Sequence, residues 1–329
     1  PDRNGVSKET SWNPKALISG PKILWKVDLG QANSNVTIEN SLLFTAGSPG
    51  MTIYCLNAKT GKIIWKYLEA NDTANATPTV DAGSVYMLGK KGILVSLNKE
   101  NGNLQWKKDL VADYGGLKPY YGFSGSPVVE KDLIILTMNK SGIALNKKAG
   151  AMIWGSEKPP ADKYPPGLEN NGVEYSTPVL YEQKGKMYAV LYSYKGIHSV
   201  ELETGNLLWL YDWQKIYKKW IATDPLIFDQ KLFLVQYLGA QFGEELGGVL
   251  FDISGATPRI LWMNKELGSN IASPVMVKGY IYLCQEGPQT GRGSLRCIDV
   301  QQGNIVWEEP LDKQPISITS AGDKLIILS

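Results

Sequence analysis

Few residues in this chain have the side chains and spacing that catalysis or metal binding would require. The sequence holds one histidine, His198, within the stretch KGIHSVELETG, which reads as a strand. A lone histidine cannot build a multi-histidine metal centre, and a Ser-His-Asp site would need it exposed at a loop end. The pair Glu244–Glu245 could bind a cation, although a solvated loop pair is the simpler interpretation. We therefore expect no catalytic residue and no metal site from these groups.

A phrase ending in tryptophan recurs along the chain and indicates its architecture. The copies are LISGPKILW at Trp25, which is the weakest, CLNAKTGKIIW at Trp65, SLNKENGNLQW at Trp106, ALNKKAGAMIW at Trp154, SVELETGNLLW at Trp209, LFDISGATPRILW at Trp262 and CIDVQQGNIVW at Trp307. Successive tryptophans are 40, 41, 48, 55, 53 and 45 residues apart. Self-similarity at this period is the signature of a solenoid, a repeat array or a propeller.

Each copy ends a unit of four short predicted strands. In the second unit the strands lie near residues 79–80 and at 85–88, 93–97 and 104–107, with turn residues between them. Four short strands per repeat are typical of one antiparallel propeller blade. The sequence therefore predicts an all-β propeller of four-stranded antiparallel blades, with six complete blades and one composite blade in this chain.

The last turn of each unit explains where the tryptophan lies. An Asn or Asp, as at Asn98, precedes a glycine by four residues and the tryptophan by eight. The Asx side chain can start the turn by bonding its own backbone, and the glycine can take a positive φ. The tryptophan then falls on the outermost strand. Because nearly every unit has one, we interpret these tryptophans as packing between blades rather than as ligand platforms.

The three cysteines cannot all pair with one another, because their number is odd. Cys55 and Cys297 occupy equivalent places in their repeats, where other copies have Ser96, Ala144, Ser199 and Leu250. A column of mostly small residues indicates tight packing, so we interpret both thiols as buried small groups. Cys284 lies on the preceding strand, and a bond to Cys297 is left open.

The two ends of the chain must meet for the ring to close. Residues 23–27 read as a lone fourth strand, and residues 316–319 and 325–328 read as two strands of the same composite blade. We expect an N-terminal arm at residues 1–22 and a single propeller domain at 23–329 that lacks its C-terminal end. The sequence stops inside a blade, so we expect the natural chain to continue past Ser329 and to close with eight blades.

The starts of the blades also repeat and should line the central channel, because a proline is tolerated at the first residue of a strand. They are Thr77-Pro78, Ser126-Pro127, Thr177-Pro178, Asp224-Pro225 and Ser273-Pro274.

Three long connections between consecutive blades, at residues 107–125, 155–175 and 210–221, are rich in aromatic residues. They contain Tyr114, Tyr120, Tyr121, Phe123, Tyr164, Tyr175, Trp213, Tyr217 and Trp220. Long loops in compact domains are often functional, and aromatics beside lysines suit a protein, peptide or glycan partner or an anionic small molecule. The alternative is that these side chains pack together as a lid over one mouth of the channel.

The composition argues against several partners. The net charge is +2, from 34 basic and 32 acidic residues, and no long run of like charge occurs, so we expect no nucleic-acid partner. No stretch of 18 apolar residues is present, so we expect no transmembrane segment. We expect a monomer.

The phrase Leu-Asn/Asp-x-x-Thr-Gly-x-x-x-Trp, cleanest at residues 56–65, resembles the repeat of pyrroloquinoline-quinone-type propellers. The resemblance covers about residues 23–329 and implies two branches. One contains quinoprotein alcohol dehydrogenases, including polyvinyl-alcohol dehydrogenases. The other is similar to BamB, a non-enzymatic propeller lipoprotein of outer-membrane assembly. The opening PDRNGVSKET also resembles the start of exported members, which implies a periplasmic or otherwise extracytoplasmic protein whose signal peptide has been removed.

The sequence lacks several motifs that the dehydrogenases carry. Many such enzymes carry an adjacent Cys-Cys pair or a haem-binding C-x-x-C-H, and this sequence has neither. Their Ca²⁺ is held by a Glu, an Asn and a catalytic Asp, which we could not assign to positions here. We therefore favour a non-enzymatic binding or scaffold propeller. The alternative is a dehydrogenase that uses pyrroloquinoline quinone (PQQ) and Ca²⁺.

Overall fold

The structure is a computed structural model. It describes residues 6–7, 13, 15, 20, 22–139, 141–155, 175–193, 196–212, 222–236, 247–286, 292–322 and 324–328.

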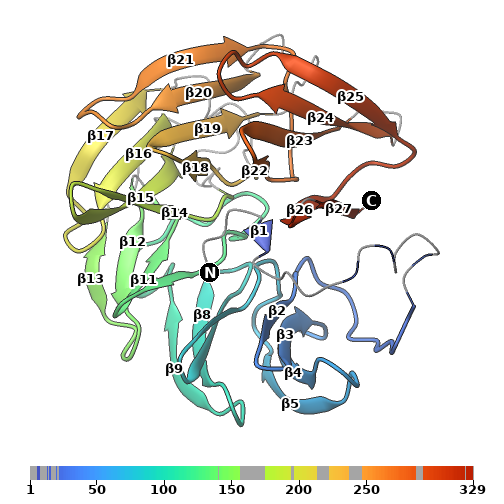
Figure 1. The fold of residues 1–329 in the computed structure, drawn as a ribbon. Coiled ribbons are helices and arrows are strands. Elements are labelled where there is room, and N and C mark those ends of the chain that lie inside the picture. The colour runs from blue at the N-terminus through green and yellow to red at the C-terminus, as the bar shows by residue number, and fades with distance from the viewer. Residues whose placement is uncertain are drawn as a thin grey trace.

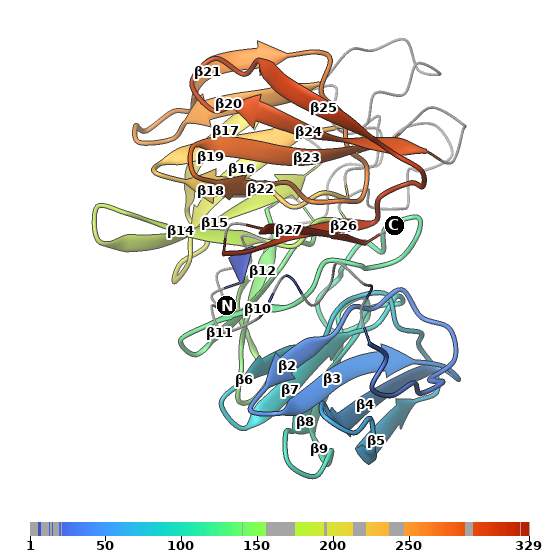
Figure 2. The same ribbon diagram turned by 45° about the vertical axis from the view of Figure 1, so that its right-hand side comes forward.

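Six complete blades each contain four antiparallel strands that follow one another in sequence order (Figures 1 and 2). Blade 1 contains β2 (Thr37–Glu39), β3 (Leu42–Gly47), β4 (Met51–Asn57) and β5 (Ile63–Glu69). Blade 2 contains β6 (Thr79–Asp81), β7 (Ser84–Leu88), β8 (Ile93–Asn98) and β9 (Leu104–Asp109). Blade 3 contains β10 (Val128–Glu130), β11 (Leu133–Leu136), β12 (Ile143–Asn146) and β13 (Met152–Gly155).

The same order continues through the second half of the chain. Blade 4 contains β14 (Val179–Gln183), β15 (Lys186–Ser193), β16 (Gly196–Glu201) and β17 (Leu207–Asp212). Blade 5 contains β18 (Leu226–Phe228), β19 (Lys231–Val235), β20 (Gly248–Asp252) and β21 (Arg259–Asn264). Blade 6 contains β22 (Val275–Val277), β23 (Tyr280–Glu286), β24 (Gly293–Asp299) and β25 (Ile305–Leu311). The predicted all-β propeller is confirmed.

The blades stand around a common centre, the axis of the propeller (Figure 1). The first strand of a blade is innermost, so that β18 contacts β14 on one side and β22 on the other. The hydrophobic core lies between adjacent blades: Phe233 and Leu250 of blade 5, for example, pack in one cluster with Ile281 and Ile298 of blade 6. The second and third strands of a blade therefore bury both faces, which explains their short continuous apolar runs, whereas the outer strands stay largely exposed.

The seventh sheet differs from the prediction in one strand. β26 (Ser317–Ala321) and β27 (Lys324–Leu328) form the expected antiparallel pair. The third strand is β1 (Val6–Ser7), which pairs with β26 in parallel. Residues 23–27 form no strand, so this part of the prediction was wrong. The local pattern fits a strand, but a strand also needs a hydrogen-bonded neighbour, and none pairs with residues 23–27 in the described part of the chain.

The small-residue column lies directly opposite the tryptophans. Its pairs are Cys55–Trp65, Ser96–Trp106, Ala144–Trp154, Ser199–Trp209, Leu250–Trp262 and Cys297–Trp307, and each of the six small or aliphatic residues is buried. A β-bulge follows every pair. A bulge bends and twists the outer strand, which lets the indole turn toward the next blade.

The cysteines are free and buried. Cys284 pairs across the sheet with Leu295, and Cys297 pairs with Tyr282. The two thiols are therefore diagonal neighbours, at a separation larger than a disulfide accepts. Burial raises the pKa of the Cys284 thiol to about 12 and that of the Cys55 thiol to about 11, so both stay protonated at neutral pH. The open question of a Cys284–Cys297 bond is answered by two free thiols.

Candidate functional site

The inner ends of the six complete blades are joined by a chain of hydrogen bonds around the channel. In each bond the backbone N–H of one blade donates to a side chain at the same position in the next blade. The bonds run from Asn35 to Thr77 Oγ1 (3.3 Å), Thr77 to Ser126 Oγ (3.2 Å), Ser126 to Thr177 Oγ1 (3.2 Å), Thr177 to Asp224 Oδ1 (2.7 Å) and Asp224 to Ser273 Oγ (2.9 Å).

This chain of bonds gives the repeated blade starts a structural task. The predicted proline follows the bonding residue in five of the six blades. Proline has no N–H, so the residue before it supplies the last donor ahead of the inner strand. All five donors are backbone N–H groups, and the acceptors are four hydroxyls and one carboxylate, that of Asp224. We conclude that these channel-lining groups first of all hold the blades in register.

The tryptophans form a second set of contacts between blades, near the opposite end of the strands. Five indole Nε1 groups each donate to a backbone carbonyl in the next turn. The pairs are Trp25 to Ala58 (3.0 Å), Trp65 to Lys99 (2.8 Å), Trp106 to Lys147 (3.0 Å), Trp154 to Leu202 (2.9 Å) and Trp262 to Val300 (2.8 Å). Trp25 makes this contact although its segment is not a strand.

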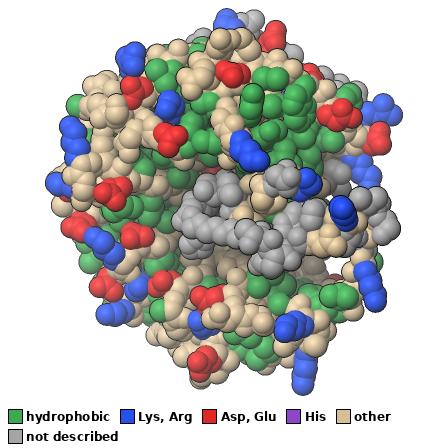
Figure 3. Space-filling model, in the orientation of Figure 1, with side chains coloured by type: hydrophobic (Ala, Val, Ile, Leu, Met, Phe, Trp, Pro, Cys, Tyr) green, Lys and Arg blue, Asp and Glu red, His purple; other side chains and the backbone are tan. Residues whose placement is uncertain are grey.

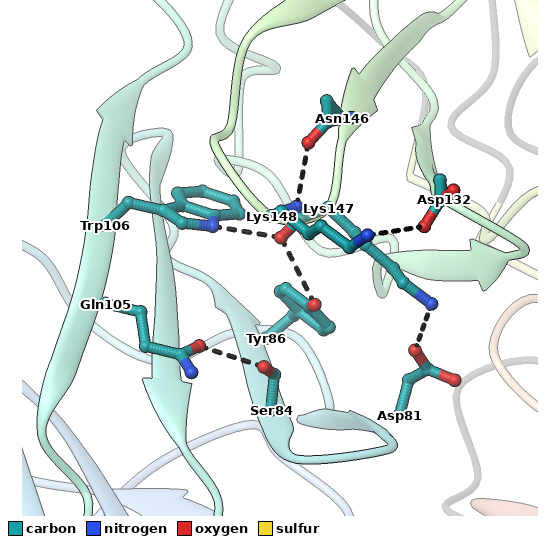
Figure 4. A network of polar contacts seen from close by, with 9 residues as sticks. All are labelled: Asp81, Ser84, Tyr86, Gln105, Trp106, Asp132, Asn146, Lys147 and Lys148. Atoms are coloured by element: carbon teal, nitrogen blue, oxygen red, sulfur yellow. Dashed lines mark hydrogen bonds and ion pairs between the residues drawn. The ribbon is translucent and has the colours of Figure 1, made fainter.

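Figure 4 shows the contact between blades 2 and 3, where one residue carries several bonds. The carbonyl of Lys147 accepts from both Trp106 and the Tyr86 hydroxyl, and its ammonium pairs with Asp81 at 2.7 Å. The turn glycine lies against the indole ring: a Cβ on Gly150 would stand 2.8 Å from Trp106. These contacts leave no room for a ligand on that face of the ring.

Blades 4 and 5 are joined in a different way. Trp209 donates to the Tyr181 hydroxyl of its own blade at 3.2 Å, and that hydroxyl is 2.7 Å from Ser199 Oγ. The carbonyl of Ile253, which corresponds to that of Lys147, instead accepts from Gln183 Nε2 at 3.0 Å. Trp307 of blade 6 is 42% exposed and makes no indole hydrogen bond to any described residue.

Three of the predicted aromatic residues, Tyr120, Tyr121 and the buried Tyr175, come together at the upper mouth, the end of the propeller where the connections between blades lie. The rings of Tyr120 and Tyr121 meet edge to face with centroids 4.9 Å apart, and both side chains are about half exposed. Tyr175 comes from the next connection, and its ring centroid lies 6.1 Å from that of Tyr121. The Tyr175 hydroxyl accepts a hydrogen bond of 3.2 Å from the backbone N–H of Tyr121. Two connections from consecutive blades therefore meet here.

Two of the predicted site residues have other places. Phe123 is 2% exposed and belongs to the core of the first three blades, and its backbone N–H donates to Lys90 O at 2.9 Å. The Tyr114 hydroxyl donates to the carbonyl of Gly150 at 2.6 Å, in the turn that receives Trp106. Both residues anchor the loop at 107–125 rather than present their rings to a partner.

The remaining aromatic residues of the prediction, Tyr164, Trp213, Tyr217 and Trp220, lie outside the described residues, as does Glu244–Glu245. Sequence reasoning missed Asp72, which is 1% exposed. Its carboxylate accepts from the backbone N–H groups of Thr73 (2.7 Å), Lys91 (2.7 Å) and Ile93 (3.0 Å) and so fixes the turn at 89–92 beneath the loop. In the sequence, Asp72 cannot be told from a solvated loop acid, because the turn that it bonds lies 17 residues or more further along the chain.

An ion pair between a buried carboxylate and an exposed lysine supports the same rim. Glu69 of blade 1 meets Lys107 of blade 2 at 2.9 Å. Burial alone would raise the pKa of Glu69, but the hydrogen bonds from Lys107 and Asn71 outweigh it, so the pKa of this carboxyl is lowered. The hydrogen bond to Glu69 likewise raises the pKa of Lys107. The pair is therefore charged on both sides at neutral pH.

The described channel residues do not fit PQQ and Ca²⁺. No group of three or more His, Cys, Asp and Glu side chains that could hold a metal occurs among the described residues. Six of the described tryptophans lie on outer strands or against turns, as given above, and the seventh, Trp307, also lies on an outer strand. The inner ring supplies hydroxyls and one carboxylate rather than a Glu, Asn and Asp set. We therefore derive no chemical step through this cofactor.

Charge and hydropathy add little specificity to the surface. Acidic and basic side chains are interspersed around the rim of the face in Figure 3. Within the described residues, no helix has the length and hydropathy needed to cross a bilayer.

The ring of four-stranded blades and the repeated tryptophan contacts define the class of PQQ-type repeat β-propellers. Within that class, the family model described as outer membrane protein assembly factor BamB matches residues 19–234 and 184–325. The chain belongs to this family.

The most informative relatives are distant in sequence. Outer membrane protein assembly factor BamB of Yersinia pestis is 23% identical over 322 residues, which cover 93% of this chain and 74% of that protein. The crystal structure of BamB from Moraxella catarrhalis has a TM-score of 0.69 at 16% identity and covers 94% of this chain and 86% of its own. Quinohemoprotein alcohol dehydrogenase ADHIIG of Pseudomonas putida has a TM-score of 0.61 at 15% identity over 92% of this chain and 64% of its own. At these identities the two structures share the fold alone.

Proposed function

We propose that this protein is a non-enzymatic scaffold that works outside the cytoplasm in the assembly of outer-membrane proteins. In this proposal it acts as a monomer and holds a protein partner at its upper mouth. Membership in the BamB family supports the class of function, because two relatives that are each matched over 93% of this chain are assembly factors. No cofactor is needed for such a role.

The exposed tyrosine pair is the observation that carries the proposal. Tyr120 and Tyr121 are about half exposed although they stand on a loop whose neighbours are fixed by buried contacts. Rigid tyrosines give a large contact area at a small cost in conformational entropy, which is why they are enriched in protein interfaces. The loop bearing them is held by the buried Phe123 and by Tyr175, and Asp72 fixes the turn at 89–92 to which the loop bonds.

The second candidate is a quinone-dependent alcohol dehydrogenase. Polyvinylalcohol dehydrogenase of a Pseudomonas species is 22% identical over 233 residues, which cover 57% of this chain and 36% of that enzyme. This similarity keeps the alternative worth testing, while the donor set of the described channel favours the scaffold.

The test is site-specific photo-crosslinking in cells of a Gram-negative host. A benzophenone amino acid replaces Tyr121 in one variant and Leu104, which is 45% exposed on the outer strand β9, in the control. We expect crosslinks to envelope proteins from position 121 and few from position 104, with the products identified by mass spectrometry.

Absence of any protein crosslink at positions 120 and 121 would overturn the partner site. Titration with PQQ and Ca²⁺ tests the alternative directly: saturable quenching together with dye-linked oxidation of an alcohol would make the protein an enzyme.

A further inference from the structure

The tyrosine pair borders a cluster of lysines on the rim of blade 2. We call Lys90, Lys91, Lys118, Tyr120 and Tyr121 the lysine–tyrosine patch; all five are exposed. The turn that carries Lys90 touches the loop that carries the tyrosines. Phe123 N–H donates to Lys90 O, and a Cβ on Gly122 would stand 2.2 Å from Lys90 Cγ. The patch is therefore one continuous surface.

Among the described residues, no carboxylate pairs with a lysine of this patch. Lys90 and Lys118 make no ion pair and no side-chain hydrogen bond with any described residue, and Lys91 Nζ donates only to the neutral carbonyl of Asn71 (2.8 Å).

The acids nearby are already occupied. Asp72 bonds three backbone amides, and Glu69 is paired with Lys107. Asp109 Oδ1 and Asp113 Oδ2 each accept from backbone N–H groups of their own turn.

We infer that the lysine–tyrosine patch binds an extended acidic segment of the partner protein, in which Asp or Glu residues are interspersed with apolar ones. This inference rests on the proposed function and adds the chemistry of the partner. Lysines that pair with no described carboxylate select acidic groups, while the edge-to-face tyrosines add an apolar surface beside them. The five side chains are exposed and come from two loops, which suits a peptide segment better than a single small anion, because a small anion would need an enclosing pocket.

The inference is tested by measuring peptide binding to the lysine–tyrosine patch. A short fluorescent peptide of Asp and Glu residues interspersed with Leu and Phe is titrated against the full chain, beside a matched peptide in which Asn and Gln replace the acids. We expect the acidic peptide to bind more tightly than the neutral one and to lose affinity as salt is raised, since exposed charges are screened.

The double substitution Lys90→Gln, Lys118→Gln is expected to lower the affinity for the acidic peptide by roughly fivefold or more, because two exposed charge contacts are lost. The matched control is Lys59→Gln with Lys62→Gln, two exposed lysines in the turn at the lower end of blade 1. The control should leave affinity within about twofold.

Equal binding of both peptides, or equal loss in the two lysine variants, would overturn the inference. The two proposals fail separately. Crosslinks from position 121 that persist in the Lys90→Gln, Lys118→Gln protein would keep the partner site and refute the acidic segment. Failure of crosslinking altogether would refute the partner site itself.

Discussion

The indole Nε1 of Trp106 donates a hydrogen bond of 3.0 Å to the backbone carbonyl of Lys147 across the boundary between blades 2 and 3. The ammonium group of Lys147 returns to blade 2 and pairs with Asp81 at 2.7 Å. A similar arrangement joins blades 1 and 2, where Trp65 donates to Lys99 O and the Lys99 ammonium pairs with Glu39 at 2.6 Å. One turn residue thus holds a neighbouring blade through both its backbone and its side chain.

Trp106→Ala is expected to lower the free energy of unfolding by about 3 kcal/mol, because it empties a packed boundary and frees the Lys147 carbonyl. Trp106→Phe keeps much of the apolar area and should cost less. Urea unfolding followed by far-UV circular dichroism measures both. Leu104→Ala, on the same strand but 45% exposed, is the control; a similar loss in it would contradict the assigned role.

Gly150→Ala should destabilise the protein by more than about 1 kcal/mol, because the residue has φ +66° and its Cβ would meet the Trp106 ring at 2.8 Å. Gly83→Ala, where a Cβ would meet nothing within 4 Å, should be close to neutral. When Gly150→Ala is combined with Trp106→Ala, the part of its destabilisation that comes from the clash with the indole ring should disappear. Full additivity of the two losses would argue that the ring and the turn are not in contact.

Stability should fall with acid partly through Glu69. The folded-state pKa of this carboxyl is lowered, so its contribution is present above the unfolded value and is lost as pH falls through the folded one. Below about pH 4.5 the unfolding free energy of the parent should therefore drop more steeply than that of Glu69→Gln. Glu203→Gln is the control, since its pair with Lys131 is largely exposed. Equal slopes for the parent and Glu69→Gln would refute this role.

Two buried tyrosines should respond in opposite ways to loss of the hydroxyl. The Tyr192 hydroxyl is buried and has no hydrogen-bond partner in the described structure, so Tyr192→Phe should be neutral or stabilising by up to about 1 kcal/mol. Tyr181→Phe removes the bonds to Trp209 and Ser199 and should cost about 1 kcal/mol or more. Thermal unfolding of the two variants compares them, and a marked loss in Tyr192→Phe would reveal a partner for that hydroxyl.

The sequence predicted only in part which aromatic residues meet at the upper mouth. The spacing of the repeats places the connections at 107–125 and 155–175 at one end of the ring, and Tyr121 and Tyr175 do meet there. Aromatic composition alone could not tell an exposed ring from an anchoring one. Phe123 is buried because its loop folds back onto the turn of Lys90, and that contact is not encoded in any local pattern.

The boundary between blades 4 and 5 makes the same point. Trp209 ends a clear copy of the phrase, yet its indole bonds Tyr181 of its own blade. The next copy has six residues between its last two strands, at 253–258, where the other blades have five, and the carbonyl of Ile253 accepts a hydrogen bond from Gln183. A changed turn in one blade thus altered a contact in its neighbour, which no single repeat reveals.

The sequence by itself determined the repeated blade, its Asx–Gly turn and the tryptophan on the outer strand, because these depend on residues within a few positions of one another. Only the tertiary structure decided that Trp25 contacts blade 1 without a strand, and that β1 rather than residues 23–27 pairs with β26. Such contacts join segments tens to hundreds of residues apart. Their formation depends on which backbone groups and side chains the arrangement of the blades brings together, and local spacing carries no record of that.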